Sequence, residues 1–332
     1  MGQNQNAIGL DVGTSRIVAA RRLGDEPSFE SQLNAFVTVP YSKITISSLV
    51  REEVPHTVQP HEIIVHGNES ERFAGLLNTE IRRPMNRGVL DPRETGALQT
   101  IREILTRMLH APAGKGRPKV CFTVPAAPLG HEGSLTYHEA TLRHLLADLG
   151  YEPSSVNEGL AVIYAEMADS NYTGIGISCG AGLCNLCLAY LSVPVLSFSI
   201  SKAGDYIDSS AAEMTGEPAN RIRLAKEESF HFNGFFADKI QQVLGVYYDD
   251  TIRSLVAALK AGFTRTSDLP KFNRPIPIVL SGGTALPSGF RERFESLVMN
   301  QDFPVKISEV RLAQNPLYST AKGALACALS EL

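Results

Sequence analysis

The sequence lacks a long uninterrupted hydrophobic run. Its longest apolar stretch, residues 183–200, is broken by an asparagine, a proline and three serines. Such interruptions predict paired strands rather than a helix that inserts into a membrane. Residues 1–6 are polar and contain neither an apolar core nor a cleavage site, so we expect no secretory signal and no amphipathic membrane anchor.

The chain also lacks a large excess of charge of either sign. A net charge of −4 over 332 residues gives no general attraction to nucleic acid, and we expect no nucleic-acid partner.

Cysteine is sparse as well. Five cysteines in a chain without a signal indicate free thiols in a reducing cytoplasm, where we expect the protein. Cys179, Cys184 and Cys187 have the spacing of an iron–sulfur site. However, Cys184 and Cys187 would point to opposite faces of one strand, which favours buried small hydrophobes instead.

The chain has the length and the element pattern of a two-lobed α/β protein. It is about twice as long as a typical single domain, so we expect two lobes. Strands and helices alternate in both halves, which predicts α/β layers with mixed sheets. We expect helices over residues 93–109, 138–149, 157–167, 205–214, 221–228, 249–261, 287–297 and 319–329, and a late strand over residues 305–307.

Three glycine turns follow short apolar strands, at residues 8–15, 174–182 and 278–284. A backbone without side chains curls tightly enough to aim several N–H groups at one phosphate. The first two turns resemble each other, because each leads into a second strand. Two such hairpins facing each other would clamp a polyphosphate. The turn residues predicted to bind it are Gly13, Thr14, Ser15, Ser178, Gly180, Ala181, Gly182, Gly282, Gly283 and Thr284.

Two carboxylates are candidates for the chemistry. Asp11 lies within the first turn, where it would repel a nucleotide unless a magnesium ion, held through water, lay between them. The alternative is an aspartate that only shapes its own turn. Glu158 opens the expected helix between the lobes, where it could orient the water that attacks a terminal phosphate. Its alternative role is to complement the helix dipole.

The remaining candidates concern the nucleoside. Lys226 and Glu227 would ordinarily belong to a solvated helix face. Between two phosphate turns they become candidates for contacts with the ribose and the base. The third turn, with Gly282 and Gly283, allows close approach to an α-phosphate or to adenosine, although an ordinary strand-to-helix turn would look the same.

The order of these motifs resembles the superfamily of actin, sugar kinases and heat-shock chaperone ATPases, over essentially the whole chain. Within it, the chain is most similar to the bacterial actin MreB family. Residues 81–91 resemble that family's Arg-Pro-Met and Gly-Val stretch, residues 203–208 its Ala-Gly-Asp segment, and residues 315–324 its closing motif.

The resemblance implies a two-lobed actin-like fold, a duplicated ribonuclease H-like fold with mixed sheets and a nucleotide cleft between the lobes. It implies ATP or ADP with Mg²⁺ in that cleft, slow hydrolysis and self-association into filaments. It also adds Gly204 and Asp205 to the nucleotide-binding residues. The first lobe would span residues 1–155 and 318–332, with a small subdomain inserted at about 32–67. The second would span 156–317, with a shortened subdomain at about 216–248.

The chain departs from the family pattern in its second turn. Ser178 stands where an aspartate is usual, Ala181 where a glycine is usual and Leu183 where a threonine is usual. A second acidic contact to magnesium is therefore missing, so hydrolysis is expected to be very slow or absent. The alternative function is an ATP-gated scaffold or assembly factor that binds a protein partner without polymerising. A small-molecule kinase is a third interpretation, but no residue stands out as a base for a substrate hydroxyl.

Overall fold

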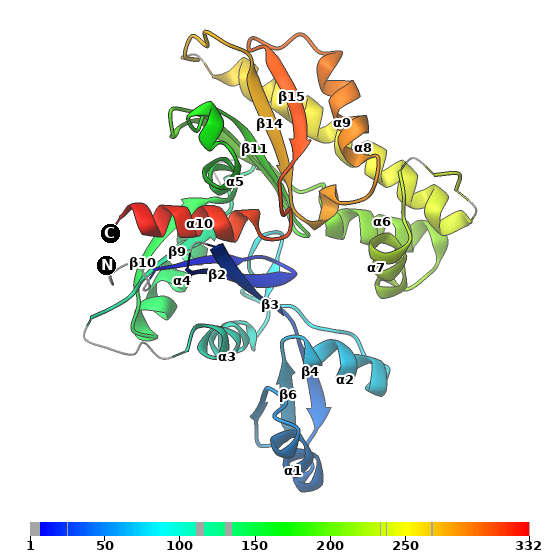
Figure 1. Cartoon of the computed structure of the whole chain (residues 1–332). Coiled ribbons are helices and arrows are strands. Elements are labelled where there is room, and N and C mark those ends of the chain that lie inside the picture. The colour runs from blue at the N-terminus through cyan, green and yellow to red at the C-terminus, as the bar shows by residue number, and fades with distance from the viewer. Residues whose placement is uncertain are drawn as a thin grey trace.

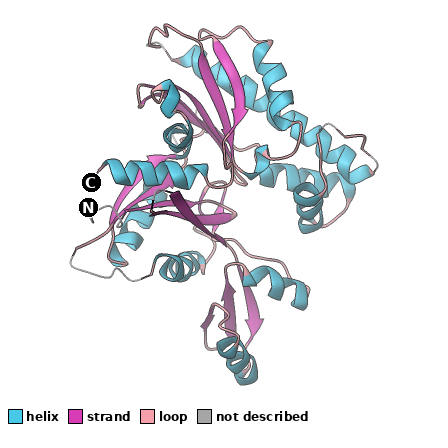
Figure 2. Cartoon of the chain, viewed as in Figure 1, coloured by secondary structure: helices cyan, strands magenta, loops and turns pink. Residues whose placement is uncertain are grey.

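The structure is a computed structural model that describes residues 7–24, 26–110, 116–129, 135–232, 234–236, 238–266 and 268–331. The polar residues 1–6 lie outside this range. Two five-stranded sheets form the centres of two lobes, with helices α5 (Glu158–Glu166) and α10 (Ser319–Ser330) between them (Figure 1). Helices and strands alternate in both lobes (Figure 2), as expected for the α/β class.

The first sheet has the strand order β10-β9-β1-β2-β3. Its central strand β1 is antiparallel to β2 and parallel to β9. Buried apolar residues of α3 and α4 cover one face of this sheet. The bounds are β1 (Ala7–Val12), β2 (Arg16–Leu23), β3 (Glu26–Leu33), α3 (Ala97–Leu109), β9 (Lys119–Val124), α4 (Thr136–Asp148) and β10 (Glu152–Asn157).

The second sheet repeats this arrangement. Its order is β13-β12-β11-β14-β15, and its central strand β11 is antiparallel to β12 and parallel to β14. Helices α6, α8 and α9 bury apolar residues against its outer face. The bounds are β11 (Gly174–Cys179), β12 (Cys184–Tyr190), β13 (Val193–Ile200), α6 (Gly204–Thr215), α8 (Lys239–Arg265), β14 (Ile276–Ser281), α9 (Phe290–Met299) and β15 (Ile307–Leu312). The repeated topology confirms the expected duplicated, two-lobed fold.

The two central helices cross between the lobes. Helix α5 follows the last strand of the first sheet but packs on β11 and β12 of the second. Helix α10 follows the last strand of the second sheet but packs on β1 and β9 of the first. The two helices also pack against each other. As a result, the first turn of each helix lies at the junction of both sheets.

Each lobe carries an outer part beside the cleft. In the first lobe a three-stranded sheet, β4-β6-β5, packs with two helices around its own small core. In the second lobe, helix α7 (Ala219–Glu228) extends beside α6 (Figure 1). The remaining elements are β4 (Phe36–Pro40), α1 (Lys43–Arg51), β5 (His56–Val58), β6 (Glu62–His66), α2 (Glu69–Leu77), β7 (Met85–Asn86), β8 (Val89–Leu90), and the short helices η1 (Ala168–Ser170) and η2 (Gly283–Ala285).

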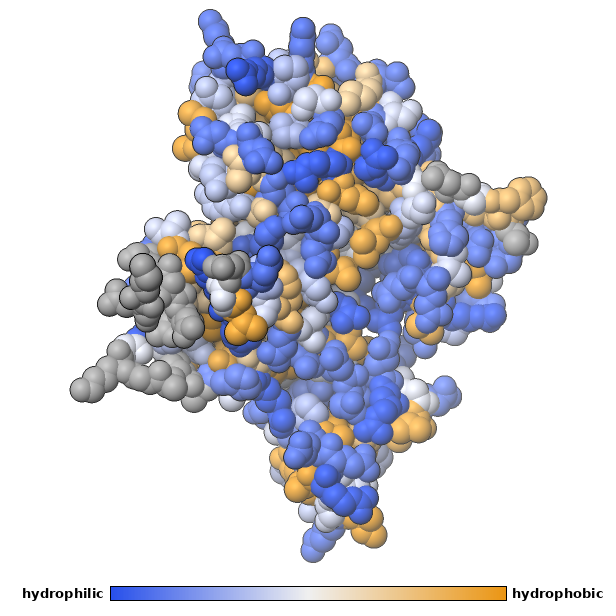
Figure 3. Space-filling model, viewed as in Figure 1, coloured by the Kyte–Doolittle hydropathy of each residue, from blue (hydrophilic) through white to orange (hydrophobic). Residues whose placement is uncertain are grey.

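The surface in Figure 3 is mostly hydrophilic, with apolar side chains exposed at the outer part of the first lobe. The largest exposures there are Ile44 on α1 and Leu76 on α2, at 80% and 71%. Among the described residues, no helix has the length and apolar content that crossing a bilayer requires.

Some expected elements differ from those observed. Helix α8 begins at Lys239, ten residues before the expected start at residue 249, so the end of the range 216–248 lies inside one helix. The late strand lies at Ile307–Leu312 instead of residues 305–307, because it pairs in parallel with β14. Helix α3 begins at Ala97 instead of residue 93. Helices α1 and α2 were not expected from the sequence.

The prediction that Cys184 and Cys187 are buried side chains on opposite faces of one strand is confirmed. Cys184 packs in the outer core of the second lobe, whereas Cys187 packs in the core around α5 and α10. All five cysteines are free thiols. No group of three or more His, Cys, Asp or Glu residues in the described parts of the chain could hold a metal ion.

Candidate functional site

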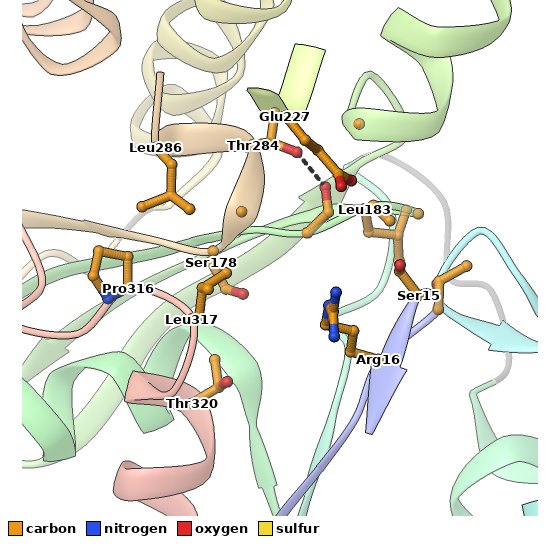
Figure 4. A pocket seen from close by; sticks show the side chains of 18 of the residues that line it. Ser15, Arg16, Ser178, Leu183, Glu227, Thr284, Leu286, Pro316, Leu317 and Thr320 are labelled. Carbon is orange, nitrogen blue, oxygen red and sulfur yellow. Dashed lines mark hydrogen bonds between the residues drawn. The ribbon is translucent and has the colours of Figure 1, made fainter. Parts of the chain in front are cut away.

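A cavity of about 750 Å³ lies between the lobes, where the three glycine turns meet (Figure 4). Every predicted site residue lines this cavity except Asp205. They come from the ends of β1, β11 and β14 and the turns that follow them, from the first residues of α5 and α6, and from the last turn of α7. The turns at residues 8–15, 174–182 and 278–284 are thus brought to one place by the repeated topology of the two sheets.

The first two turns have the same hydrogen bond. In the first, the N–H of Gly13 donates to the carbonyl of Arg16 over 2.9 Å; in the second, the N–H of Gly180 donates to the carbonyl of Leu183 over 3.0 Å. The two turns approach each other closely. A side chain at Gly182 would come within 2.4 Å of the Thr14 hydroxyl, so this contact requires glycine.

The third turn depends on backbone conformation. Gly282 has φ of +89°, and a Cβ there would lie 2.2 Å from the carbonyl oxygen of Cys179. Only glycine fits both conditions. Thr284, two residues later, donates from Oγ1 to the Gly180 carbonyl over 2.8 Å, the bond drawn in Figure 4. The third turn is therefore fixed to the second.

The beginning of α6 is also fixed to the second turn. The N–H groups of Gly204 and Asp205 donate to the carbonyls of Gly180 and Ala181, over 3.1 and 2.8 Å. The Asp205 side chain does not line the cavity. Its carboxylate accepts from Arg83 in the first lobe over 2.7 Å. The sequence placed Asp205 at the ligand, but the structure places it in an ion pair across the cleft.

Lys226 and Glu227, on α7, both line the cavity. The Lys226 ammonium lies 2.7 Å from Asp208, and both side chains are only 10% exposed. It also donates to the Gly204 carbonyl over 3.3 Å. Lys226 therefore already fixes α7 to α6, in addition to any contact with a ligand.

Asp11, on β1, and Glu158, the first residue of α5, both line the cavity. Asp11 accepts hydrogen bonds from the hydroxyls of Thr123 and Thr320, and burial raises its pKa. Glu158 Oε2 accepts from Ser178 over 3.2 Å and from Asn185 over 2.8 Å. Burial, and then repulsion by Asp11, raise the pKa of Glu158 to about 8. Without a ligand, Glu158 therefore holds a proton at neutral pH.

Three of these partners were not predicted as site residues. Asn185 is fully buried, and its amide oxygen accepts from the N–H of Ala126 over 2.8 Å while its nitrogen donates to Glu158. An asparagine within an apolar strand was the available sequence signal. Thr123 and Thr320 carry no such signal, since each is an ordinary residue until the fold brings it to Asp11.

The lining of the cavity also includes apolar side chains. They are Phe230, Tyr248, Leu286 and Leu317, and the Phe230 and Tyr248 rings stack with centroids 4.7 Å apart. The cavity thus combines backbone N–H groups, two carboxyl groups and an aromatic and aliphatic wall.

Several solved structures are similar to this chain in overall fold. MamK in a double helical filament is similar over 97% of this chain and 98% of its own, with 19% identity and a TM-score of 0.74. MreB5 of Spiroplasma citri bound to ADP is similar over 96% and 94%, with 16% identity and a TM-score of 0.66. The ethanolamine utilization protein EutJ from Carboxydothermus hydrogenoformans is similar over 96% and 89%, with 17% identity and a TM-score of 0.57. These likenesses show the actin-like fold.

No curated protein sequence matches the chain. A family model does match it, over residues 6–328, and its description is Volactin. Because the match spans nearly the whole chain, the protein belongs to the volactin family, with an actin-like fold.

Proposed function

We propose that this protein binds ATP or ADP in the interlobe cavity and assembles into filaments under nucleotide control. The observation that carries the proposal is the meeting of three glycine turns, from both lobes, around one cavity that also contains Asp11 and Glu158. Backbone N–H groups in such turns suit phosphate oxygens. The apolar wall with Phe230 and Tyr248 suits a nucleobase, with Lys226 and Glu227 near the ribose.

The residues present fit a magnesium ion that accompanies the phosphates. Asp11 and Glu158 raise each other's cost of ionisation, which a divalent cation between Asp11 and the phosphates would relieve. Two carboxyl groups are too few to hold the ion alone, so its other ligands would be phosphate and water oxygens. When bound, the ion would offset the negative charge of the phosphates. Asp11 would hold it through water.

Hydrolysis is proposed to be slow. Glu158 lines the cavity, which supports a role in orienting a water near the terminal phosphate, but its raised pKa leaves it protonated without a ligand. Ser178 supplies a hydroxyl, which donates to Glu158, in place of a second acid. A protonated Glu158 and a serine hydroxyl would therefore position water and metal less effectively than a pair of ionised carboxylates.

Filament formation is supported by the likeness to MamK, whose structure was determined as a double helical filament. Head-to-tail contacts between identical subunits produce open polymers when the rotation between subunits does not close. Nucleotide would act by favouring one arrangement of the two lobes.

The alternative is a scaffold that binds a protein partner without polymerising. The modest outer part of the second lobe, where only α7 lies between α6 and α8 among the described residues, favours that alternative.

High-speed sedimentation and negative-stain microscopy test the proposal. We expect filaments with ATP, and fewer or none with ADP or without nucleotide. Asp11→Asn should abolish the ATP-dependent pellet, whereas Asp148→Asn, at an exposed aspartate 62% accessible on α4, should not. Monomers at micromolar concentration in every nucleotide state would contradict filament formation and favour the scaffold.

A further inference from the structure

Arg16 is the residue of the first turn that the nucleotide motifs did not include. It is the first residue of β2, and its carbonyl closes the turn by accepting from Gly13. Side chains alternate along a strand, so Arg16 lies on the same face as Val18, which also lines the cavity. Figure 4 shows the Arg16 side chain pointing into the cavity, across from Ser178.

The Arg16 guanidinium has no acidic partner in the described parts of the chain. Among the described residues that line the cavity, two are arginine or lysine, namely Arg16 and Lys226. Lys226 is held 2.7 Å from Asp208. No described carboxylate lies within the 4.0 Å that defines an ion pair with Arg16, although Asp11 belongs to the same turn. An exposed arginine facing a cavity with no acid beside it suits an incoming anion.

The first two glycine turns carry different charges at equivalent positions. Asp11 and Ser178 occupy equivalent positions on the central strands, since each is directly opposite a strand residue that lines the cavity, Val18 or Asn185. Arg16 and Leu183 are equivalent because each accepts the hydrogen bond that closes its turn. The first turn thus has an acid and a base, and the second has neither. Of these two turns, only the first therefore offers a cationic side chain to an incoming anion.

We propose that Arg16 binds the polyphosphate of the nucleotide directly. Its guanidinium supplies part of the positive charge that a metal ion, held by a second acidic residue, would otherwise bring to the phosphates. This inference rests on the proposed nucleotide site. Its consequence is that ATP binding depends on Arg16 most strongly when no divalent cation is present. Because AMP lacks the β- and γ-phosphates, its binding should depend on Arg16 much less.

Isothermal titration of the full-length protein with ATP, in buffers with MgCl₂ or with EDTA, tests this. In EDTA, Arg16→Gln should weaken ATP binding by about ten- to a hundredfold, the range for losing a charge-assisted hydrogen-bonded pair. With MgCl₂ the loss should be smaller, and AMP affinity should change by no more than about twofold. Arg16→Lys keeps the charge without the planar fork and should recover part of the affinity.

Arg22→Gln is the matched control, because Arg22 is an exposed residue of the same strand that does not line the cavity. Circular dichroism checks that Arg16→Gln, a change at an exposed side chain, leaves the protein folded. If the wild-type protein binds no ATP in either buffer, both the nucleotide site and this inference are wrong. If wild type and Arg16→Gln bind ATP equally in EDTA, the nucleotide site stands and the role of Arg16 is wrong.

Discussion

Ser178 donates a hydrogen bond from Oγ to Glu158 Oε2 over 3.2 Å, from the end of β11 to the first residue of α5. Both residues belong to the junction of the two lobes. Burial and repulsion by Asp11 destabilise the ionised form of the Glu158 carboxyl group. The hydrogen bond from the serine hydroxyl stabilises that form. At this position an aspartate would add a third carboxyl group, whose ionisation is favourable only when a cation is bound.

Ser178→Asp should therefore have opposite effects with and without ligand. Without nucleotide, repulsion among three carboxyl groups should lower the thermal midpoint. With ATP and Mg²⁺, the added acid should accelerate phosphate release, which a coupled phosphate assay measures. Ser178→Ala, which removes the hydroxyl without adding charge, is the control and should not accelerate release. An unchanged or lower rate for Ser178→Asp would show that a missing acid does not limit hydrolysis.

Glu158 should make stability depend on pH in the nucleotide-free protein. Its pKa is raised from 4.5 to about 8, so the folded state holds a proton that the unfolded state releases between these values. The stabilisation is full below pH 4.5 and is lost as pH rises through about 8. Glu158→Gln should reduce the fall in melting temperature across this interval by at least about 3 °C. Glu213→Gln, at an exposed glutamate on α6, should leave the fall unchanged; an equal effect of both substitutions would contradict the assignment.

Glu158 also has a predicted role in turnover. Glu158→Ala should abolish residual ATP hydrolysis while leaving ATP affinity within about threefold of wild type, since water orientation contributes to the transition state rather than to ground-state binding. Steady-state phosphate release and titration calorimetry measure the two quantities separately. Loss of ATP binding in this variant would instead assign Glu158 a structural role, with Asn185 and Ser178 as the contacts it supports.

The cleft is bridged by ion pairs between its outer parts. Arg83 contacts Asp205 over 2.7 Å, and Arg223 on α7 contacts Glu71 on α2 over 2.6 Å. Partly exposed pairs of this kind contribute up to about 1 kcal/mol, so Arg83→Gln should speed nucleotide dissociation by up to about fivefold. Stopped-flow release of a fluorescent ATP analogue measures this rate.

The matched control for the cleft is Arg93→Gln. It removes an arginine whose partner, Asp91, lies in the same segment rather than across the cleft. The dissociation rate should not change in this variant. If both substitutions accelerate release equally, the effect comes from net charge and the pair between Arg83 and Asp205 does not hold the lobes together.

Gly282 should be among the least replaceable positions of the site. Gly282→Ala would force a side chain against the Cys179 carbonyl at a backbone angle that alanine rarely adopts, which should cost more than about 2 kcal/mol of unfolding free energy. Urea denaturation measures it. Gly75→Ala, on α2 with open space around it, should stabilise the protein by up to about 1 kcal/mol. A mild effect at Gly282 would mean that the third turn can rearrange.

The sequence predicted the turns and the duplicated fold because these features are local. Glycines after buried strands, and a repeated strand-turn-strand pattern, can be seen without knowing what packs nearby. The contacts of Asp11 with Thr320 and of Glu158 with Asn185 cannot, since they arise where helices from one lobe pack on the other sheet. The pairing of Asp205 with Arg83 has the same origin: two motifs that looked independent meet across the cleft.

The start of α8 shows a different limit. Gly245 interrupts the helical pattern in the sequence, yet in the structure it makes room for the ring of Phe236, so the helix continues through it. Packing outweighs the low helix propensity of one glycine.

Hydrogen–deuterium exchange with and without ATP tests the central claim most directly, namely that the three turns hold one ligand. We predict that ATP slows exchange together in the segments 13–16, 180–183 and 282–284, with no comparable change in the three-stranded sheet of β4, β5 and β6. Protection of one turn alone, or no protection in any of them, would contradict a nucleotide site shared by both lobes.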